Sequence, residues 1–134
     1  MFVVDASVVA SWAFPDEDEP AAQAAFRLLA SQKAIAPTLF WFELRNVLLV
    51  GERRRRIVPA QTARFLKFVA VLPIETDREP DESAVMSLAR THKLTVYDTA
   101  YLELAQRKTL PLATLDTALV KAARAEHAAL IEPG

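Results

Sequence analysis

Short segments rich in apolar residues alternate along this chain with longer segments whose apolar residues recur at helical spacing. The short segments predict strands over residues 2–4, 34–36, 74–76, 112–115 and 129–131. The other segments predict helices over residues 6–14, 21–33, 38–54, 59–72, 81–92, 98–107 and 117–126. Because the first run, Phe2-Val3-Val4, is apolar at every position, it suits a strand covered on both faces.

Strands that alternate with helices predict an α/β fold. Parallel strands joined by helices cross over in a right-handed sense, so the helices cover both faces of the sheet. We therefore expect a small, mainly parallel sheet with helices on both faces. The 134 residues contain no linker, repeat or low-complexity segment, and this length is typical of one domain, so residues 1–134 are predicted to form a single domain.

Glycine, cysteine and histidine are scarce or absent, which excludes several kinds of catalytic and binding site. The two glycines, Gly51 and Gly134, are too few for a P-loop or a dinucleotide-binding loop. The chain has no cysteine, which excludes a thiolate nucleophile and a cysteine-ligated metal. His92 and His127 are the only histidines, so a multi-histidine metal site is excluded as well. Carboxylates are the groups left for catalysis.

Charge and hydropathy bear on partners and location. The net charge of −1 gives no overall attraction to nucleic acid or to an anionic membrane, so any such binding needs a local patch. The apolar N-terminus is interrupted by Asp5 and has no basic residue before it, unlike a signal peptide. No stretch approaches the roughly 18 apolar residues that span a bilayer. We expect a cytoplasmic protein with no membrane association.

Four carboxylates lie in unusually apolar surroundings. Asp5 lies in FVVDASVVA, Glu43 in LFWFELRNVLLV, Asp98 in LTVYDTAYL and Asp116 in LATLDTALV. An ionised carboxylate is costly to bury unless a cation or hydrogen bonds compensate for the lost hydration. One bound divalent cation would account for all four placements.

The predicted topology brings these acids together. Asp5 and Asp116 each follow a predicted strand and precede a helix, which puts both at the carboxyl edge of the sheet, where ligands of open α/β sheets bind. Asp98 starts a predicted helix that can reach the same edge. Two further groups have supporting roles. Ser7 and Thr114 add hydroxyls two residues from Asp5 and Asp116, and Asn46 shares a helix face with Glu43 and could hold its carboxylate or a water bound to it.

Each acid also has a structural interpretation. Asp5, Asp98 and Asp116 could be helix N-caps, and Glu43 could be a buried partner of Arg45 or Asn46. A single site that gathers all four explains them together. Oxygen ligands favour Mg²⁺ or Mn²⁺ over zinc, and a metal held by carboxylates without a histidine base points to hydrolysis of a phosphodiester.

The ordered acidic motifs resemble those of PIN-domain ribonucleases, in particular the small VapC-type toxins. The resemblance rests on MFVVDASVVASW at the N-terminus, ELRNVLL around Glu43, TVYDTAYLELA around Asp98 and LATLDTAL around Asp116. It covers essentially the whole chain and implies a PIN-like three-layer α/β/α fold. It also implies that Asp5, Glu43, Asp98 and Asp116 form a catalytic metal pocket, with Asp5 and Asp98 as direct ligands. Asn46, Ser7 and Thr114 match its supporting positions.

The resemblance further implies a function and partners. The protein would be a Mg²⁺-dependent endoribonuclease, with Mn²⁺ as a substitute, that hydrolyses RNA with a metal-activated water. It would be the toxin of a toxin–antitoxin module, restrained by a cognate antitoxin, and a homodimer. The apolar faces of the first helices, including Trp12, Phe14 and Trp41, could receive the antitoxin or a second copy of the chain.

Other features admit two interpretations. A run of four arginines follows Glu52 and could contact the RNA backbone or be a solvated helix end: Arg53, Arg54, Arg55 and Arg56. The aromatic residues Trp12, Phe14, Trp41 and Phe42 suit a core or a subunit interface better than base stacking. The two histidines are expected at the surface.

Three rival functions compete with this interpretation, and the sequence argues against the first two. A phosphoacceptor receiver domain needs adjacent acids near its N-terminus and a lysine after a late strand, whereas here apolar residues precede Asp5 and no lysine follows residues 112–116 until Lys121. A haloacid-dehalogenase phosphatase needs Asp-x-Asp, whereas Ser7 follows Asp5 at that spacing. A catalytically silent PIN fold that binds RNA or protein is the third alternative, and a nuclease assay with Mg²⁺ would separate it from an enzyme.

Overall fold

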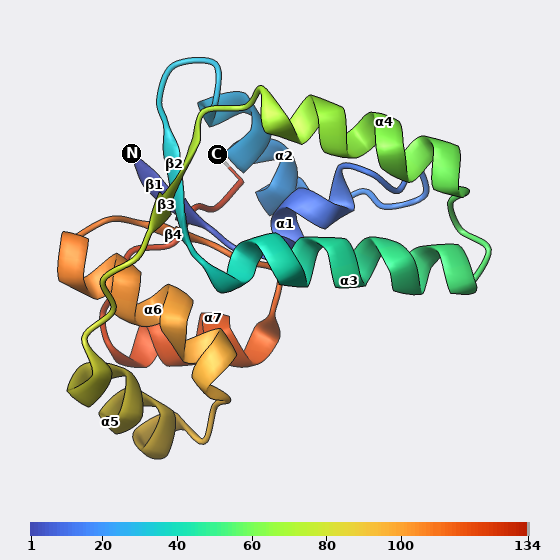
Figure 1. The fold of residues 1–134 in the computed structure, drawn as a ribbon. Coiled ribbons are helices and arrows are strands. Elements are labelled where there is room, and N and C mark those ends of the chain that lie inside the picture. The colour runs from blue at the N-terminus through green and yellow to red at the C-terminus, as the bar shows by residue number, and fades with distance from the viewer. Residues whose placement is uncertain (134) are drawn as a thin grey trace.

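The computed structural model describes residues 1–133, which fold around a four-stranded sheet in the order β3-β2-β1-β4 (Figure 1). Its strands are β1 (Phe2–Val4), β2 (Ala34–Pro37), β3 (Ile74–Asp77) and β4 (Leu112–Ala113). All three strand pairs are parallel. The carboxyl ends of the strands therefore meet at one edge of the sheet.

Helices cover both faces of this sheet. They are α1 (Ala6–Ser11), α2 (Pro20–Leu28), α3 (Leu39–Arg53), α4 (Pro59–Ala70), α5 (Glu82–His92), α6 (Val96–Lys108) and α7 (Thr117–Ala125). In Figure 1, α1–α4 lie to the right of the sheet and α5–α7 lie below it. The predicted three-layer α/β/α fold is confirmed. Within residues 1–133, no helix combines the length and apolar character that crossing a membrane requires.

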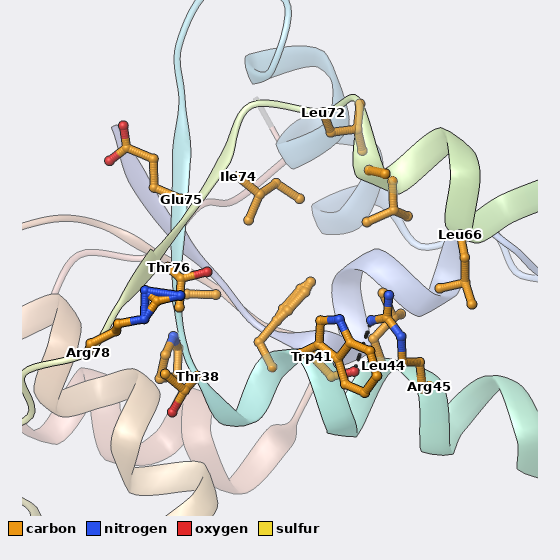
Figure 2. A pocket seen from close by; sticks show the side chains of 15 residues that line it. Thr38, Trp41, Leu44, Arg45, Leu66, Leu72, Ile74, Glu75, Thr76 and Arg78 are labelled. Atoms are coloured by element: carbon orange, nitrogen blue, oxygen red, sulfur yellow. Dashed lines mark hydrogen bonds between the residues drawn. The ribbon is translucent and has the colours of Figure 1, made fainter.

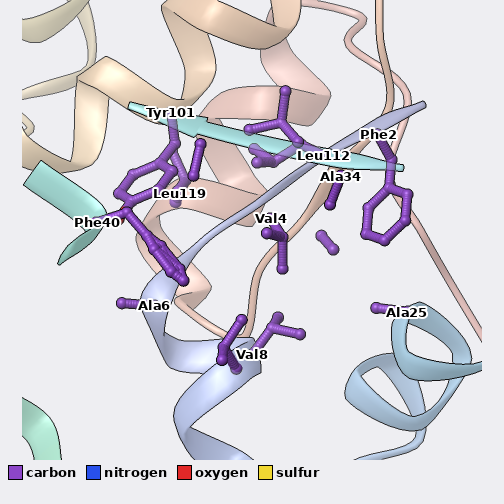
Figure 3. Close-up of a cluster of buried hydrophobic side chains, with 14 of the residues drawn as sticks. Phe2, Val4, Ala6, Val8, Ala25, Ala34, Phe40, Tyr101, Leu112 and Leu119 are labelled. Atoms are coloured by element: carbon purple, nitrogen blue, oxygen red, sulfur yellow. The ribbon is translucent and has the colours of Figure 1, made fainter. Parts of the chain in front are cut away.

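The core is built on β1, whose three residues are fully buried. This is the strand that the continuous apolar run predicts. Side chains of the neighbouring strands and of helices from both layers pack against it. Figure 3 shows Phe2 at one end of this cluster and Phe40 and Tyr101 at the other. The central strand is thus packed on both faces, and this packing positions the residue that follows it, Asp5.

Some predicted boundaries are wrong. Residues 129–131 form no strand: Leu130 makes a single parallel bridge to Leu112, because β4 is only two residues long and offers nothing more to pair with. β4 ends at Ala113, two residues before the predicted end, and the hydroxyl of Thr114 donates a hydrogen bond to Asp5 Oδ2. The helix predicted from Asp98 begins at Val96, capped by the Thr95 side chain.

An ionic network that the sequence analysis did not identify positions α6. Glu103 is buried within α6, and its Oε1 accepts hydrogen bonds from Arg107 Nε at 2.6 Å and from the Asp81 amide at 3.1 Å. Arg107 also binds the Asp77 carboxylate at the end of β3, with 2.6 Å from Nη2 to Oδ2, and holds the pKa of Asp77 below its usual range. These contacts tie the end of β3 and the start of α5 to α6, the helix that carries Asp98.

Candidate active site

Asp5 follows β1 directly and is buried at the carboxyl edge of the sheet. Its Oδ1 accepts hydrogen bonds from Ser7 Oγ at 2.5 Å and from the Val8 amide at 3.2 Å, so it also caps α1. Its Oδ2 accepts one from Thr114 Oγ1. Because Val4 pairs with Ala113 across β1 and β4, Thr114 arrives at the same edge as Asp5. The structure thus places both predicted hydroxyls against this carboxylate.

Asp116 lies beside this cluster. Its Oδ1 accepts a hydrogen bond from the Leu119 amide at 3.0 Å and caps α7, as the structural interpretation expects. Its own amide donates to Thr114 Oγ1 at 3.0 Å. Thr114 therefore contacts both aspartates, and capping and membership of an acidic site coexist at Asp5 and Asp116.

Asp98 lies in the first turn of α6 and does not cap that helix. Thr95 is the N-cap, and its hydroxyl accepts the Asp98 amide at 3.1 Å. The prediction that Asp98 starts the helix is therefore wrong by two residues. Because Thr95 supplies the N-cap, N-capping by Asp98 does not explain its half-buried carboxylate. Burial raises the pKa of Asp98, and a hydrogen bond with the Thr95 side chain opposes that shift.

Glu43 lies in the second turn of α3, half-buried, and Tyr101 of α6 donates a hydrogen bond to its Oε1 at 2.6 Å. The sequence suggests that Asn46 could hold this carboxylate or a water bound to it. Asn46 is exposed, and among residues 1–133 the side-chain hydrogen bond to Glu43 comes from Tyr101. The sequence gives no signal for Tyr101, because an aromatic residue in an apolar helix looks like ordinary core.

Electrostatics link the four acids. Burial is the largest cause of the shift at three of them: it raises the pKa of Asp5 from 3.8 to about 6 and also raises the pKa values of Glu43 and Asp98. Hydrogen bonds from Ser7, Thr114 and the Val8 amide oppose the shift at Asp5. The negative charge of Asp116 further raises the pKa of Asp5 and Asp98, and that of Asp98 raises the pKa of Glu43. The structure therefore places the four predicted acids within electrostatic reach of one another in a chain of three pairs: Asp5 with Asp116, Asp116 with Asp98, and Asp98 with Glu43.

This donor set fits a hard divalent cation. Every polar side-chain group at the site offers oxygen, which suits Mg²⁺ or Mn²⁺. Among residues 1–133, no group of three or more acidic or imidazole side chains is placed to hold a metal ion. Mg²⁺ does not require such a group, because it usually keeps several waters and is held through one or two carboxylates. A positive charge beside Asp5, Glu43 and Asp98 would offset the cost of burial that raises their pKa values.

The four arginines of the run have different surroundings in the structure. Arg53, Arg54 and Arg55 are exposed at the far end of α3, where they could meet an RNA backbone. Arg56 is engaged: its Nη2 lies 3.1 Å from Asp16 Oδ1 and 2.9 Å from Glu17 Oε2, and its guanidinium stacks over the Phe14 ring. Contact of this run with RNA stays a prediction, and Arg56 already forms contacts within the protein.

The aromatic residues and the histidines singled out in the sequence also differ in their exposure. Phe14 is buried and Trp12 is partly buried, whereas Trp41 and Phe42 are 55% and 71% exposed on α3. Trp41 and Arg45 lie side by side at a cavity between α3, α4 and β3, where the guanidinium stacks on the indole (Figure 2). His127 is exposed as predicted. His92 is not fully exposed, because it pairs with Glu126 across 2.6 Å.

Burial of Asp5 predicts a pH dependence of stability in metal-free protein. Because the folded protein binds this proton more tightly than the unfolded chain, the stabilisation is present below about pH 4 and is lost as pH rises through about 6. Between pH 4 and 7, the free energy of unfolding should fall by about 2 kcal/mol more in the wild type than in Asp5→Asn. Urea melts in EDTA measure this difference.

The exposed acid Glu82 gives the matched control, since Glu82→Gln should keep the fall in stability that the buried Asp5 causes in the wild type. If the curves of the wild type and Asp5→Asn stay parallel across this range, the carboxylate is not buried as the structure has it.

Comparisons with known proteins identify the family and the fold of this chain. A family model described as PIN domain matches residues 2–125. PAE2754 from Pyrobaculum aerophilum has a TM-score of 0.71 and 26% identity, covering 90% of this chain and 83% of its own. VapC20 from Mycobacterium tuberculosis has a TM-score of 0.61 and 12% identity, covering 91% and 95%. FitAcB from Neisseria gonorrhoeae has a TM-score of 0.58 and 20% identity, covering 99% and 98%.

No match was found among curated proteins. The two structures of lower identity show a shared fold. The family model spans nearly the whole chain, including all four acids at the sheet edge. On this evidence the chain belongs to the PIN domain family.

Proposed function

We propose that this protein is a divalent-metal-dependent endoribonuclease and the toxin of a toxin–antitoxin module. The proposal rests on the placement of Asp5, Glu43, Asp98 and Asp116, which lie within electrostatic reach of one another near the carboxyl edge of the sheet. PIN domains are generally nucleases, which supports the enzymatic half. VapC20 is described as a toxin that cleaves the sarcin-ricin loop, which supports RNA as the substrate and toxicity as the outcome.

The residues divide the chemical work. Asp5 and Asp98 would hold the cation, with Asp116 and Glu43 completing the acidic surroundings. Ser7 and Thr114 fix the direction of the Asp5 carboxylate, so its lone pairs are oriented before a cation arrives. When bound, a divalent cation supplies Lewis acidity for water activation and positive charge opposite the phosphodiester. We propose Mg²⁺ as this cation, with Mn²⁺ as a substitute.

Cleavage should depend on the two acids assigned as direct ligands. Asp5→Asn and Asp98→Asn should each lower kcat/KM on RNA by about 100-fold or more, because a bound cation stabilises transition-state charge by several kcal/mol and each 1.4 kcal/mol is tenfold. EDTA should abolish the activity of the wild type and added Mg²⁺ should restore it. The assay follows cleavage of total RNA and then of purified fragments.

Glu82→Gln serves as the control, since this exposed acid of α5 should leave kcat/KM unchanged. Full activity in both aspartate variants would contradict the assignment of the site. Specific RNA binding by a folded wild type that cleaves nothing with Mg²⁺ or Mn²⁺ would instead favour the silent PIN module.

A toxic nuclease needs a restraint, and an apolar groove offers a place for the antitoxin that we propose. The groove lies between α1, α2 and the end of α4 and has a volume of about 500 Å³. Trp12 and Phe26 pack edge to face in it with ring centroids 5.1 Å apart, and Phe68 continues the row 6.2 Å from Phe26. Phe26 and Phe68 are 43% and 39% exposed. An apolar antitoxin segment would cover these rings.

Trp41 does not line this groove, so it is not part of the surface that we assign to the antitoxin. With Phe42 it forms a separate exposed aromatic patch on α3. We propose this patch as the contact between two copies of the chain. We also propose a cytoplasmic location, where both RNA and a newly made antitoxin are available.

A charge placed in the groove should disrupt antitoxin binding and spare the nuclease. Phe26→Glu should raise the Kd for a co-expressed antitoxin by about 30-fold or more, because a truncated aromatic hot spot costs about 2 kcal/mol or more. Val71→Glu is the control, since Val71 is 80% exposed and lies outside the groove. Calorimetry measures both, and equal affinities for the two variants would move the antitoxin to another surface.

A further inference from the structure

Tyr101 is a buried residue whose hydroxyl reaches the candidate site from another helix. Its side chain is 2% exposed and packs in the core cluster, at the same end as Phe40 (Figure 3). Its hydroxyl donates to Glu43 Oε1 at 2.6 Å, which joins two residues 58 positions apart. The contact therefore links α6 to α3 at the acidic site.

The contact has a specific physical effect on Glu43. A hydrogen bond to a carboxylate is stronger than one between neutral groups and favours the ionised form, which metal binding needs. It also restricts the rotation of a long side chain, which would otherwise point in several directions. Because Tyr101 is held by core packing, it supplies a fixed reference that an exposed side chain could not.

The same helix carries an acid of the site. Asp98 and Tyr101 are three residues apart on α6, so they project from neighbouring positions on one face. Asp5 is oriented in a comparable way by Ser7 and Thr114, whereas Asn46 is exposed and leaves Glu43 to Tyr101. Each of the two carboxylates thus receives a hydroxyl from a separate part of the fold.

We propose that Tyr101 is a positioning residue: its hydroxyl holds the Glu43 carboxylate toward Asp98 and thereby sets the affinity of the acidic site for a divalent cation. The inference rests on the proposed function and adds a residue to it. Since Tyr101 is buried, it acts through Glu43 and has no contact with RNA.

Tyr101→Phe removes the hydroxyl and keeps the ring. Its Kd for Mn²⁺ should rise by about 10-fold, the low end of the range for groups that orient metal ligands. With RNA, kcat should fall while KM is unchanged. In a Glu43→Gln background the same substitution should change the Mn²⁺ affinity by less than about twofold, because the group it acts through is gone. Titration of free Mn²⁺ by EPR at 10 °C gives each affinity.

The chain offers a matched control on the same helix. Tyr97 is 63% exposed, so Tyr97→Phe should bind Mn²⁺ as the wild type does. If Tyr101 is purely structural, Tyr101→Phe will lower Tm and leave the Mn²⁺ affinity unchanged, and this result overturns the inference. A loss of Mn²⁺ affinity that is equally large in the Glu43→Gln background also overturns it. A wild type that binds no Mn²⁺ overturns the proposed function together with it.

If Tyr101→Phe does not fold, fluorine NMR can address the same question. The chain has two tyrosines, so Tyr97→Phe protein made with 3-fluorotyrosine reports on Tyr101 alone. Addition of Mg²⁺ should shift this signal, and the shift should vanish with Glu43→Gln. A signal that Mg²⁺ leaves unmoved contradicts the inference.

Discussion

Burial of the Asp5 carboxylate at the end of the central strand constrains the rest of this structure. β1 is covered on both faces, so the residue that follows it has little water to solvate its charge. Hydrogen bonds from Ser7, Thr114 and the Val8 amide compensate only in part, and the pKa remains raised to about 6. A bound cation would remove the remaining cost, and this need unites the fold with the proposed chemistry.

The parallel topology brings other polar side chains to the buried Asp5 carboxylate. Because β1 and β4 are adjacent and parallel, Asp5 and Thr114 meet although 109 residues separate them. α6 adds Asp98, and its position depends on the buried Glu103 and on Arg107, which reaches Asp77 at the end of β3. An ionic network that takes no part in catalysis thus helps to hold one side of the acidic site.

The sequence predicts the layers, the order of strands and helices, and the four acids, because apolar runs and buried carboxylates are strong local signals. It does not predict which hydroxyl holds Glu43, since Tyr101 lies in a segment whose apolar character suggests core alone. Glu103 satisfies the same criterion as the four acids, as it lies in YLELA with Arg107 one turn later, and this signal could have found the network. The engagement of Arg56 depends on a loop packed across from it, which periodicity cannot show.

The central claim is that the acidic edge of this sheet binds a divalent cation, and thermal melting at neutral pH with and without millimolar Mn²⁺ tests it most directly. Ligand that binds the folded state alone stabilises by about 2.7 kcal/mol at 100 times its Kd. The account predicts that Mn²⁺ raises the Tm of the wild type by several degrees and leaves the Tm of an Asp5→Asn, Asp98→Asn double variant unchanged. No rise in the wild type, or an equal rise in both proteins, would contradict it.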